Sequence, residues 1–159
     1  MKITTETTKH ETVIVNANFA NVLCLLQDDH AWMTDLLVNS GKPPMIVKWV
    51  RFMSKTRLVS GIIPENSTRF VTWGLIGINA WVAYQIERID DQTIKLTPIP
   101  FLPLWQKVVI ALSLAIFLVV PVVLAPVFWK LKERNTLQNG WEYLQGFCRL
   151  VGSENSENF

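Results

Sequence analysis

The sequence has few residues of the kinds that bind metals or act as nucleophiles: it contains two cysteines and two histidines among 159 residues. Cys24 and Cys148 are too few for a disulfide framework, and no spacing in the chain is that of a metal site. His10 and His30 stand apart, without a serine, cysteine or carboxylate at the spacing of a catalytic triad. These absences lead us to expect no metal, no cofactor and no identifiable catalytic residue.

Charge is also scarce in this chain. Charged residues make up 18% of it, and the formal net charge is +2. Proteins that bind nucleic acids usually carry a basic stripe, so we expect no nucleic-acid partner. The one tight basic group is Lys130, Lys132 and Arg134, which directly follows an apolar run and suits lipid head groups. Half of the residues are hydrophobic, which excludes a disordered chain.

Glycine-rich and targeting motifs are missing as well. Gly74 and Gly77 lack the third glycine and the following helix of a dinucleotide-binding loop, so the pair predicts a hairpin turn. Residues 1–11 are polar and rich in threonine, unlike a signal peptide. We therefore expect the part of the chain before the apolar run to stay in the cytoplasm.

What the sequence does have is one long apolar run, residues 108–129, in which Ser113 is the only polar side chain. A helix of this length would be about 33 Å long, close to the hydrocarbon thickness of a bilayer. Trp105 and Trp129 stand at its two ends, where indole rings favour the membrane interface. The run predicts insertion into a membrane.

Two prolines, Pro121 and Pro126, leave two interpretations of the run open. The run is either a kinked helix that spans the bilayer, or a hairpin in which residues 108–120 enter and residues 122–129 return. Basic residues after the run favour a cytoplasmic C-terminus, and the lack of a signal favours a cytoplasmic N-terminus. Both ends are cytoplasmic only if the run does not span, so we favour the hairpin. A single span in a complex with other membrane proteins is the alternative.

The rest of the chain predicts an α+β domain. Residues 11–16 read as a strand, residues 19–26 as a helix, and a second short helix contains Trp32. Apolar residues recur at helical spacing over residues 130–151, which predicts a long final helix. This helix would cover the apolar face of an antiparallel sheet, and a cavity between the two would suit an apolar ligand. Five further strands are expected, at residues 45–52, 56–63, 69–74, 80–87 and 93–98.

The opening stretch ETVIVNANFANVLCLLQDDHAWMTDLL resembles the start of the SRPBCC or START-like superfamily. That start is a strand, a short capping motif and two helices, and Val22, Leu25, Leu26, Asp28 and Trp32 stand at the matching places. The resemblance implies a helix-grip fold, in which an antiparallel sheet wraps around a long C-terminal helix. It also implies binding of lipids or other apolar molecules.

Three later stretches extend the resemblance: IIPENSTRFVTWG, AWVAYQIERIDDQTIKLTPIPF and LAPVFWKLKERNTLQNGWEYLQGF. The chain departs from the family pattern because its apolar run lies between the last strand and the final helix. The sequence therefore predicts five parts: a tail at 1–10, the sheet region at 11–106, a transmembrane or re-entrant segment at 107–130, a closing helix at 131–152 and a tail at 153–159.

Four aromatic residues on predicted strands are the candidate ligand contacts: Trp49, Trp73, Trp81 and Tyr84. We expect a membrane-anchored binding protein for an apolar molecule such as a lipid, quinone, polyketide or pigment. Its partners would be the bilayer, this small molecule and other membrane proteins, with the folded domain on the cytoplasmic side. An accessory subunit of a larger membrane complex is the alternative, and an aromatase or cyclase is a third.

Overall fold

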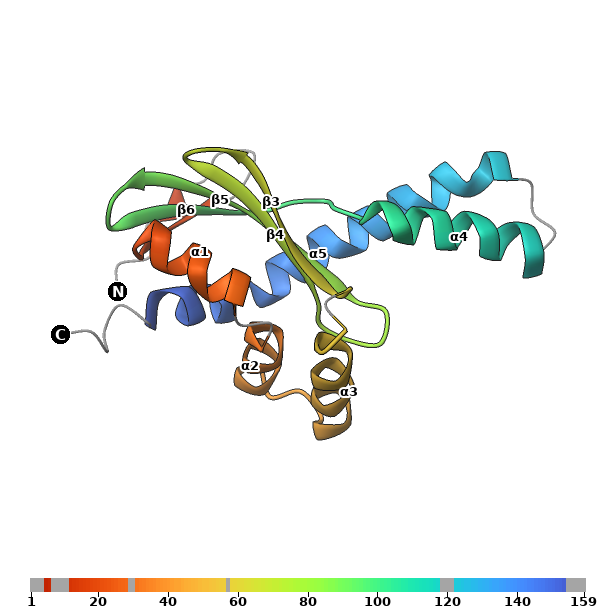
Figure 1. Cartoon of the computed structure of the whole chain (residues 1–159), viewed down its shortest axis with the longest axis horizontal. Coiled ribbons are helices and arrows are strands. Elements are labelled where there is room, and N and C mark those ends of the chain that lie inside the picture. The colour runs from red at the N-terminus through yellow and green to blue at the C-terminus, as the bar shows by residue number, and fades with distance from the viewer. Residues whose placement is uncertain (1–4, 7–11, 29–30, 57, 118–121, 154–159) are drawn as a thin grey trace.

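The structure is a computed structural model that describes residues 5–6, 12–28, 31–56, 58–117 and 122–153. A curved antiparallel sheet and the helices that cover it form one body, and a helical hairpin projects from it (Figure 1). The strands are β1 (Thr5–Glu6), β2 (Thr12–Asn16), β3 (Ser60–Asn66), β4 (Arg69–Leu75), β5 (Trp81–Asp90) and β6 (Thr93–Pro98). The helices are α1 (Phe19–Asp28), α2 (Trp32–Asn39), α3 (Pro44–Ser54), α4 (Leu104–Phe117), the 3₁₀ turn η1 (Val122–Leu124) and α5 (Ala125–Ser153).

The sheet has the strand order β1-β2-β6-β5-β4-β3, and every neighbouring pair is antiparallel. Hydrogen bonds from backbone amides to side chains stabilise the turns between its strands. The side-chain oxygen of Asn66 accepts a hydrogen bond from the Thr68 amide at 2.9 Å, and Asp90 accepts one from the Gln92 amide at 2.8 Å. Strand β6 has the bounds that the sequence predicts, and β2, β4 and β5 differ by a few residues.

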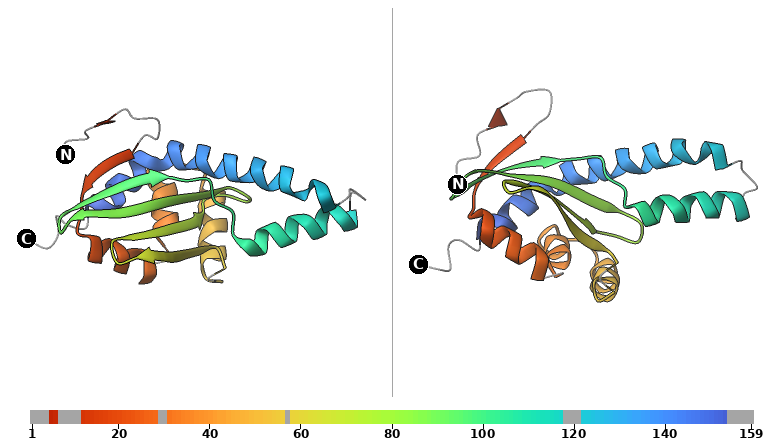
Figure 2. Two further views of the ribbon diagram at one scale, coloured as in Figure 1. Left: turned by 90° about the horizontal axis from the view of Figure 1, so that it is seen from above. Right: turned by 45° about the horizontal axis from the view of Figure 1, so that its top comes forward.

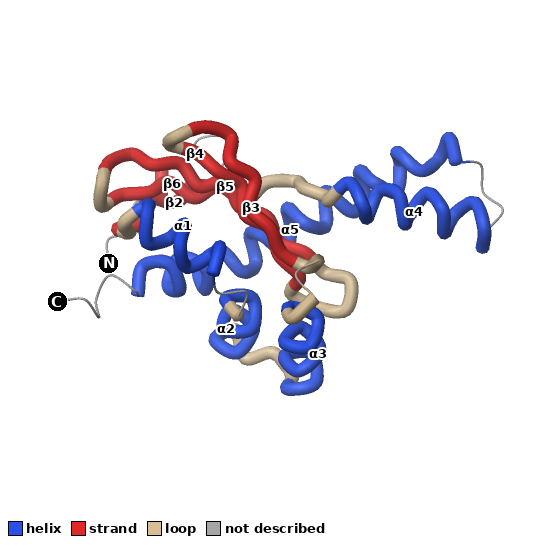
Figure 3. Tube along the Cα trace, in the orientation of Figure 1, coloured by secondary structure: helices blue, strands red, loops and turns tan. Residues whose placement is uncertain are grey.

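The helices α1, α2 and α5 lie on one face of this sheet (Figure 3). Tyr84 on β5 stacks on Phe147 of α5 with a centroid separation of 4.2 Å, and both side chains are fully buried. The Tyr84 hydroxyl donates a 3.0 Å hydrogen bond to the Gly140 carbonyl of α5. Burial raises the pKa of Tyr84 well above its usual value, so the phenol stays neutral in this core.

These contacts confirm the coarse prediction of an α+β fold with an antiparallel sheet and a long C-terminal helix, an arrangement compatible with the helix-grip fold. Leu144, Cys148 and Val151 of the predicted apolar face are buried against the sheet side, as their spacing indicates. Burial also raises the pKa of the Cys148 thiol to about 11, which marks it as an unreactive core residue.

The prediction of a strand at residues 45–52 is wrong, because this segment lies inside helix α3. The run of Val, Ile, Trp and Phe suggested a strand. The buried positions, however, are Val47, Val50 and Ser54, which recur at helical spacing. Pro44 occupies the first turn, where its fixed φ and missing amide hydrogen favour helix initiation. The strand predicted at residues 56–63 begins only at Ser60.

The apolar run is divided between two helices. Its first part belongs to α4, and its last part is the beginning of α5, which continues without interruption into the helix on the sheet. The predicted turning point at Pro121 lies outside the described residues. The two arms lie side by side and extend beyond the sheet (Figure 2). Among the described residues, no helix is both long enough and apolar enough to cross a bilayer.

Candidate functional site: the helical hairpin and its base

The hairpin of α4, η1 and the first turns of α5 exposes many large apolar side chains, which we call the hairpin surface. Ile116 is 66% exposed and Val123 is 78% exposed. Leu114 and Ala125, in contrast, are buried. The hairpin surface consists of Leu104, Trp105, Val108, Val109, Leu112, Ile116, Val123, Leu124, Val127, Phe128 and Leu131.

Polar contacts join the two arms at the base of the hairpin. The Trp129 indole N–H donates a 3.0 Å hydrogen bond to the Lys107 carbonyl. The Lys107 ammonium lies 3.0 Å from the Glu133 carboxylate and 6.0 Å from the centre of the Trp129 ring. No charged residue occurs between Lys107 and Lys130 in the sequence. The charged residues of both arms therefore stop near the contact between Lys107 and Trp129. Between Lys107 and Lys130 in the sequence, every side chain is apolar apart from Ser113.

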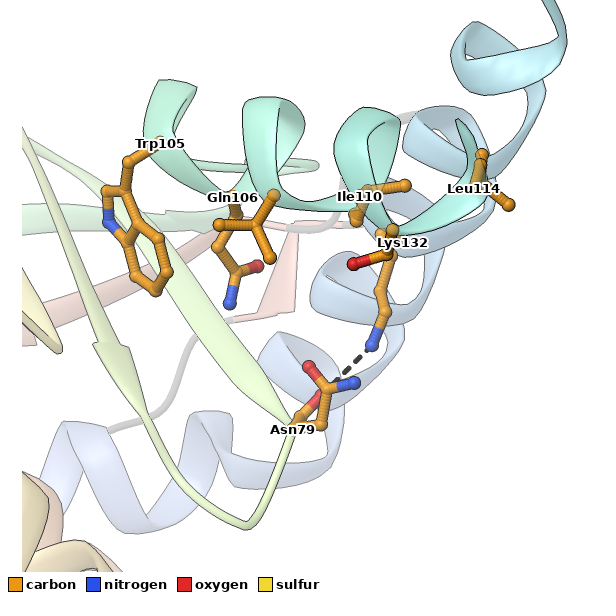
Figure 4. Close-up of a pocket in the computed structure, with 8 residues that line it drawn as sticks. Asn79, Trp105, Gln106, Ile110, Leu114 and Lys132 are labelled. Atoms are coloured by element: carbon orange, nitrogen blue, oxygen red, sulfur yellow. Dashed lines mark hydrogen bonds between the residues drawn. The ribbon is translucent and has the colours of Figure 1, made fainter. Parts of the chain in front are cut away.

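A cavity of about 480 Å³ lies beside this base, between α4, α5 and the loop that joins β4 to β5 (Figure 4). Its walls are mainly apolar, and four polar side chains stand among them. The lining residues are Asn79, Trp105, Gln106, Val109, Ile110, Ser113, Leu114 and Lys132.

Lys132 and Gln106 give the cavity its polar character. The Lys132 ammonium donates a 3.2 Å hydrogen bond to the Asn79 carbonyl, and burial lowers the pKa of this lysine. The side-chain oxygen of Gln106 is buried and has no hydrogen-bond partner among the residues that the structure describes. A buried acceptor of this kind is normally paired. The cavity thus has one cation, Lys132, next to apolar walls, with the buried Gln106 amide in its lining, a combination that suits an amphipathic molecule.

The four aromatic residues predicted as ligand contacts occupy three different places. Trp73 and Trp81 lie together on the opposite face of the sheet from Tyr84, with ring centres 5.7 Å apart. Trp105 of α4 contacts Trp81 at 5.8 Å, so this cluster connects the sheet to the hairpin. Tyr84 lies in the core beneath α5. Trp49 lies on α3, where it lines a separate hollow.

None of these four side chains lines the cavity at the base of the hairpin. Their role as ligand contacts stays a prediction. The cavity instead combines three segments that are distant in the sequence, represented by Asn79, Gln106 and Lys132. Lys132 belongs to the basic group that the sequence marks as a lipid-facing feature. Asn79 and Gln106 carry no such signal, because only the fold brings the Asn79 loop and Gln106 of α4 together with Lys132.

Comparisons with known proteins found no matching family model, no matching curated protein and no matching solved structure. The molecule combines a common fold class with two unusual features. It is an α+β domain whose long C-terminal helix packs on an antiparallel sheet, with an apolar helical hairpin and a part-polar cavity at the hairpin's base.

Proposed function

We propose that the protein attaches to a bilayer by inserting its helical hairpin into one leaflet, and that it holds an apolar or amphipathic ligand at the membrane surface. The single observation that carries this proposal is the hairpin surface, which exposes large apolar side chains on both arms of a projection and lies mostly on the charge-free stretch between Lys107 and Lys130. Exposed apolar patches of this kind mark interaction sites with membranes or proteins.

Insertion into a single leaflet fits the dimensions of the hairpin. The part of α4 from Val108 to Phe117 is about 15 Å long, which is half of the roughly 30 Å hydrocarbon core. Away from the ends of each helix, the backbone hydrogen bonds are made internally, as lipid requires. The basic residues Lys130 and Arg134 follow the apolar part of α5 at the level of the head groups. The same basic residues support the cytoplasmic face as the side of attachment.

The energetics also favour insertion. Transfer of a half-exposed Leu, Ile or Val side chain from water to an apolar phase contributes roughly 1 kcal/mol. The hairpin surface as a whole would then contribute on the order of 10 kcal/mol. At about 0.8 kcal/mol per CH₂, a buried myristoyl chain contributes a similar gross amount, so the hairpin surface would be an anchor of comparable strength, to which the basic residues add.

The ligand proposal rests on the cavity at the base of the hairpin. In an inserted hairpin this cavity lies beside the leaflet, so a ligand would enter it from lipid without crossing water. Its apolar walls would hold a chain or ring, and Lys132 and Gln106 would face an oxygen-bearing or donor-bearing head. The resemblance to the SRPBCC or START-like superfamily, whose members bind apolar molecules, supports the same class of ligand.

The core between the sheet and α5 favours a second candidate, an accessory subunit of a membrane complex. Tyr84 and Phe147 fill the space between β5 and α5 at their position, where the family resemblance implies a ligand cavity. In such a subunit the hairpin surface would pack against a partner protein within the membrane.

Flotation with lipid vesicles tests the proposed attachment. The full chain is expected to float with vesicles of phosphatidylcholine, and Leu112→Glu with Ile116→Glu is expected to leave most of the protein in the dense fraction. Ile89→Glu is the matched control, because Ile89 is 51% exposed on β5, outside the hairpin, and its replacement should not affect flotation. Equal flotation of all three proteins would contradict hairpin insertion.

Extraction of the detergent-purified protein with organic solvent, followed by mass spectrometry, tests the ligand proposal. We expect an amphipathic molecule in stoichiometric amount, and a lower yield from Gln106→Leu. Purification in a stable complex with a larger membrane protein, with no extracted ligand, would instead favour the accessory subunit.

A further inference from the structure

Helix α3 carries an exposed apolar stripe of its own. Met45, Trp49 and Phe52 are 79%, 38% and 63% exposed and recur at i, i+4 and i+7. The opposite side of the helix is held to the domain by Val47 and Val50, which are buried. An amphipathic helix whose apolar side faces solvent has a free face for docking.

Basic residues run along one edge of this stripe. Lys48, Arg51 and Lys55 are exposed, and none of them has an ion-pair partner in the part of the chain that the structure describes. The sequence of α3, PMIVKWVRFMS, contains no acidic residue. An apolar stripe with Trp and Phe, flanked by Lys and Arg, is the composition of helices that lie in the membrane interface.

The stripe is continuous with the base of the hairpin. Ile78, in the loop between β4 and β5, is 74% exposed and lines a hollow of about 250 Å³ with Met45, Ile46 and Trp49. The next residue, Asn79, accepts the hydrogen bond from Lys132 and lines the cavity beside α4. The apolar stripe of α3 therefore continues through Ile78 to Asn79, and Asn79 contacts α5 at the base of the hairpin.

The direction of α3 fits the same arrangement. In Figures 1 and 2 the helix runs crosswise to the long axis of the hairpin, and the β4–β5 loop lies between them. A hairpin that enters the bilayer end-on would therefore leave α3 approximately parallel to the membrane surface. This is the orientation in which an interfacial helix buries its apolar side.

We propose that α3 and Ile78 form a second membrane contact, which binds the head-group region of anionic lipids and fixes the orientation of the domain on the bilayer. This inference rests on the proposed insertion of the hairpin. The hairpin anchors the protein by apolar burial, and Lys48, Arg51 and Lys55 add an electrostatic preference for negatively charged lipid. Lys48, Arg51 and Lys55 would thus fix the orientation of the domain on the bilayer together with the hairpin.

The test compares vesicles of pure phosphatidylcholine with vesicles that also contain phosphatidylglycerol, using the full chain. The wild type is expected to bind both, with roughly tenfold or greater preference for the anionic vesicles. The triple variant K48Q/R51Q/K55Q should lose most of this preference, keeping only the part that Lys130 and Arg134 contribute, and should keep its binding to neutral vesicles. Added salt should also reduce the preference of the wild type, because exposed charges are screened.

The control variant R88Q/K95Q/R149Q removes the same charge from surfaces away from α3 and should retain the preference. If K48Q/R51Q/K55Q kept the full anionic preference of the wild type while the wild type bound neutral vesicles, the role of α3 would be refuted and hairpin insertion would stand. If the wild type bound neither vesicle, both proposals would fail. If Met45→Glu changed only the oligomeric state and left vesicle binding unaltered, α3 would be a contact between two copies of the chain, which also overturns the proposal.

Discussion

Gly140 is a residue at which α5 packs closely against the sheet. A Cβ atom added there would lie 2.9 Å from the Cβ of Pro98, and the Ala83 carbonyl oxygen lies 3.7 Å away. The same residue supplies the carbonyl that accepts the Tyr84 hydrogen bond. Glycine is a poor helix former, so its presence in mid-helix here reflects this close approach rather than any helical preference.

Gly140→Ala is expected to destabilise the protein by about 1–3 kcal/mol, because the contact with Pro98 can be relieved only by moving α5 away from the sheet. Chemical denaturation in detergent, followed by tryptophan fluorescence, measures the change. Gly152→Ala on the same helix is the control. Its added Cβ would meet Val15 at 3.5 Å, an ordinary contact, so the free energy of unfolding should stay equal or rise slightly. Equal effects of the two substitutions would argue against the close packing at Gly140.

At the scale of elements, the hairpin depends on its base. The arms are joined there by the hydrogen bond from Trp129 to the Lys107 carbonyl and by the ion pair of Lys107 with Glu133. Both contacts are part-buried, but a partly solvated ion pair contributes little by itself, whereas Trp129 supplies a hydrogen bond and also a ring beside the Lys107 ammonium. We therefore assign the alignment of α4 against α5 mainly to Trp129.

Trp129→Phe keeps a large apolar ring and removes the donor, so it is expected to weaken the closed hairpin by about 1 kcal/mol. Amide hydrogen exchange of α4 in detergent should become roughly fivefold faster, while exchange in β5 stays the same. Trp141→Phe, on α5 outside the hairpin, serves as the control and should leave α4 unaffected. Unchanged exchange in α4 of the Trp129 variant would show that the arms are held by apolar contacts instead.

The elements also show what the sequence could predict. Strand β6 and the first two helices follow from local signals, since turn residues and apolar periodicity mark them clearly. Helix α3 was mistaken for a strand because Ile46, Val47, Val50 and Phe52 have strand propensity, and tertiary packing decided otherwise. The cavity lining could not be derived, because Asn79, Gln106 and Lys132 meet only once the hairpin has formed.

For the whole molecule, the proposed membrane insertion must be compatible with a closed fold. The final helix packs on the sheet through Phe147 and Tyr84, and its first turns belong to the apolar run. If the run crossed the bilayer, α5 would be separated from the sheet that it covers. A hairpin avoids this conflict, because α4 carries the chain away from the sheet and α5 brings it back.

If the hairpin inserts as proposed, both ends of the chain lie on the same side of a membrane. The protein would be bound to the outside of sealed vesicles, with one epitope tag at each terminus, and then treated with a protease. Both tags should be digested without detergent, because Val108 to Phe117 reaches only about 15 Å into the bilayer and the rest of the chain stays with the sheet. A lumenal marker protein, digested only after detergent is added, verifies that the vesicles are sealed. Protection of one tag, with digestion of the other, would show that the run crosses the membrane and that α5 is not packed on the sheet in the inserted protein.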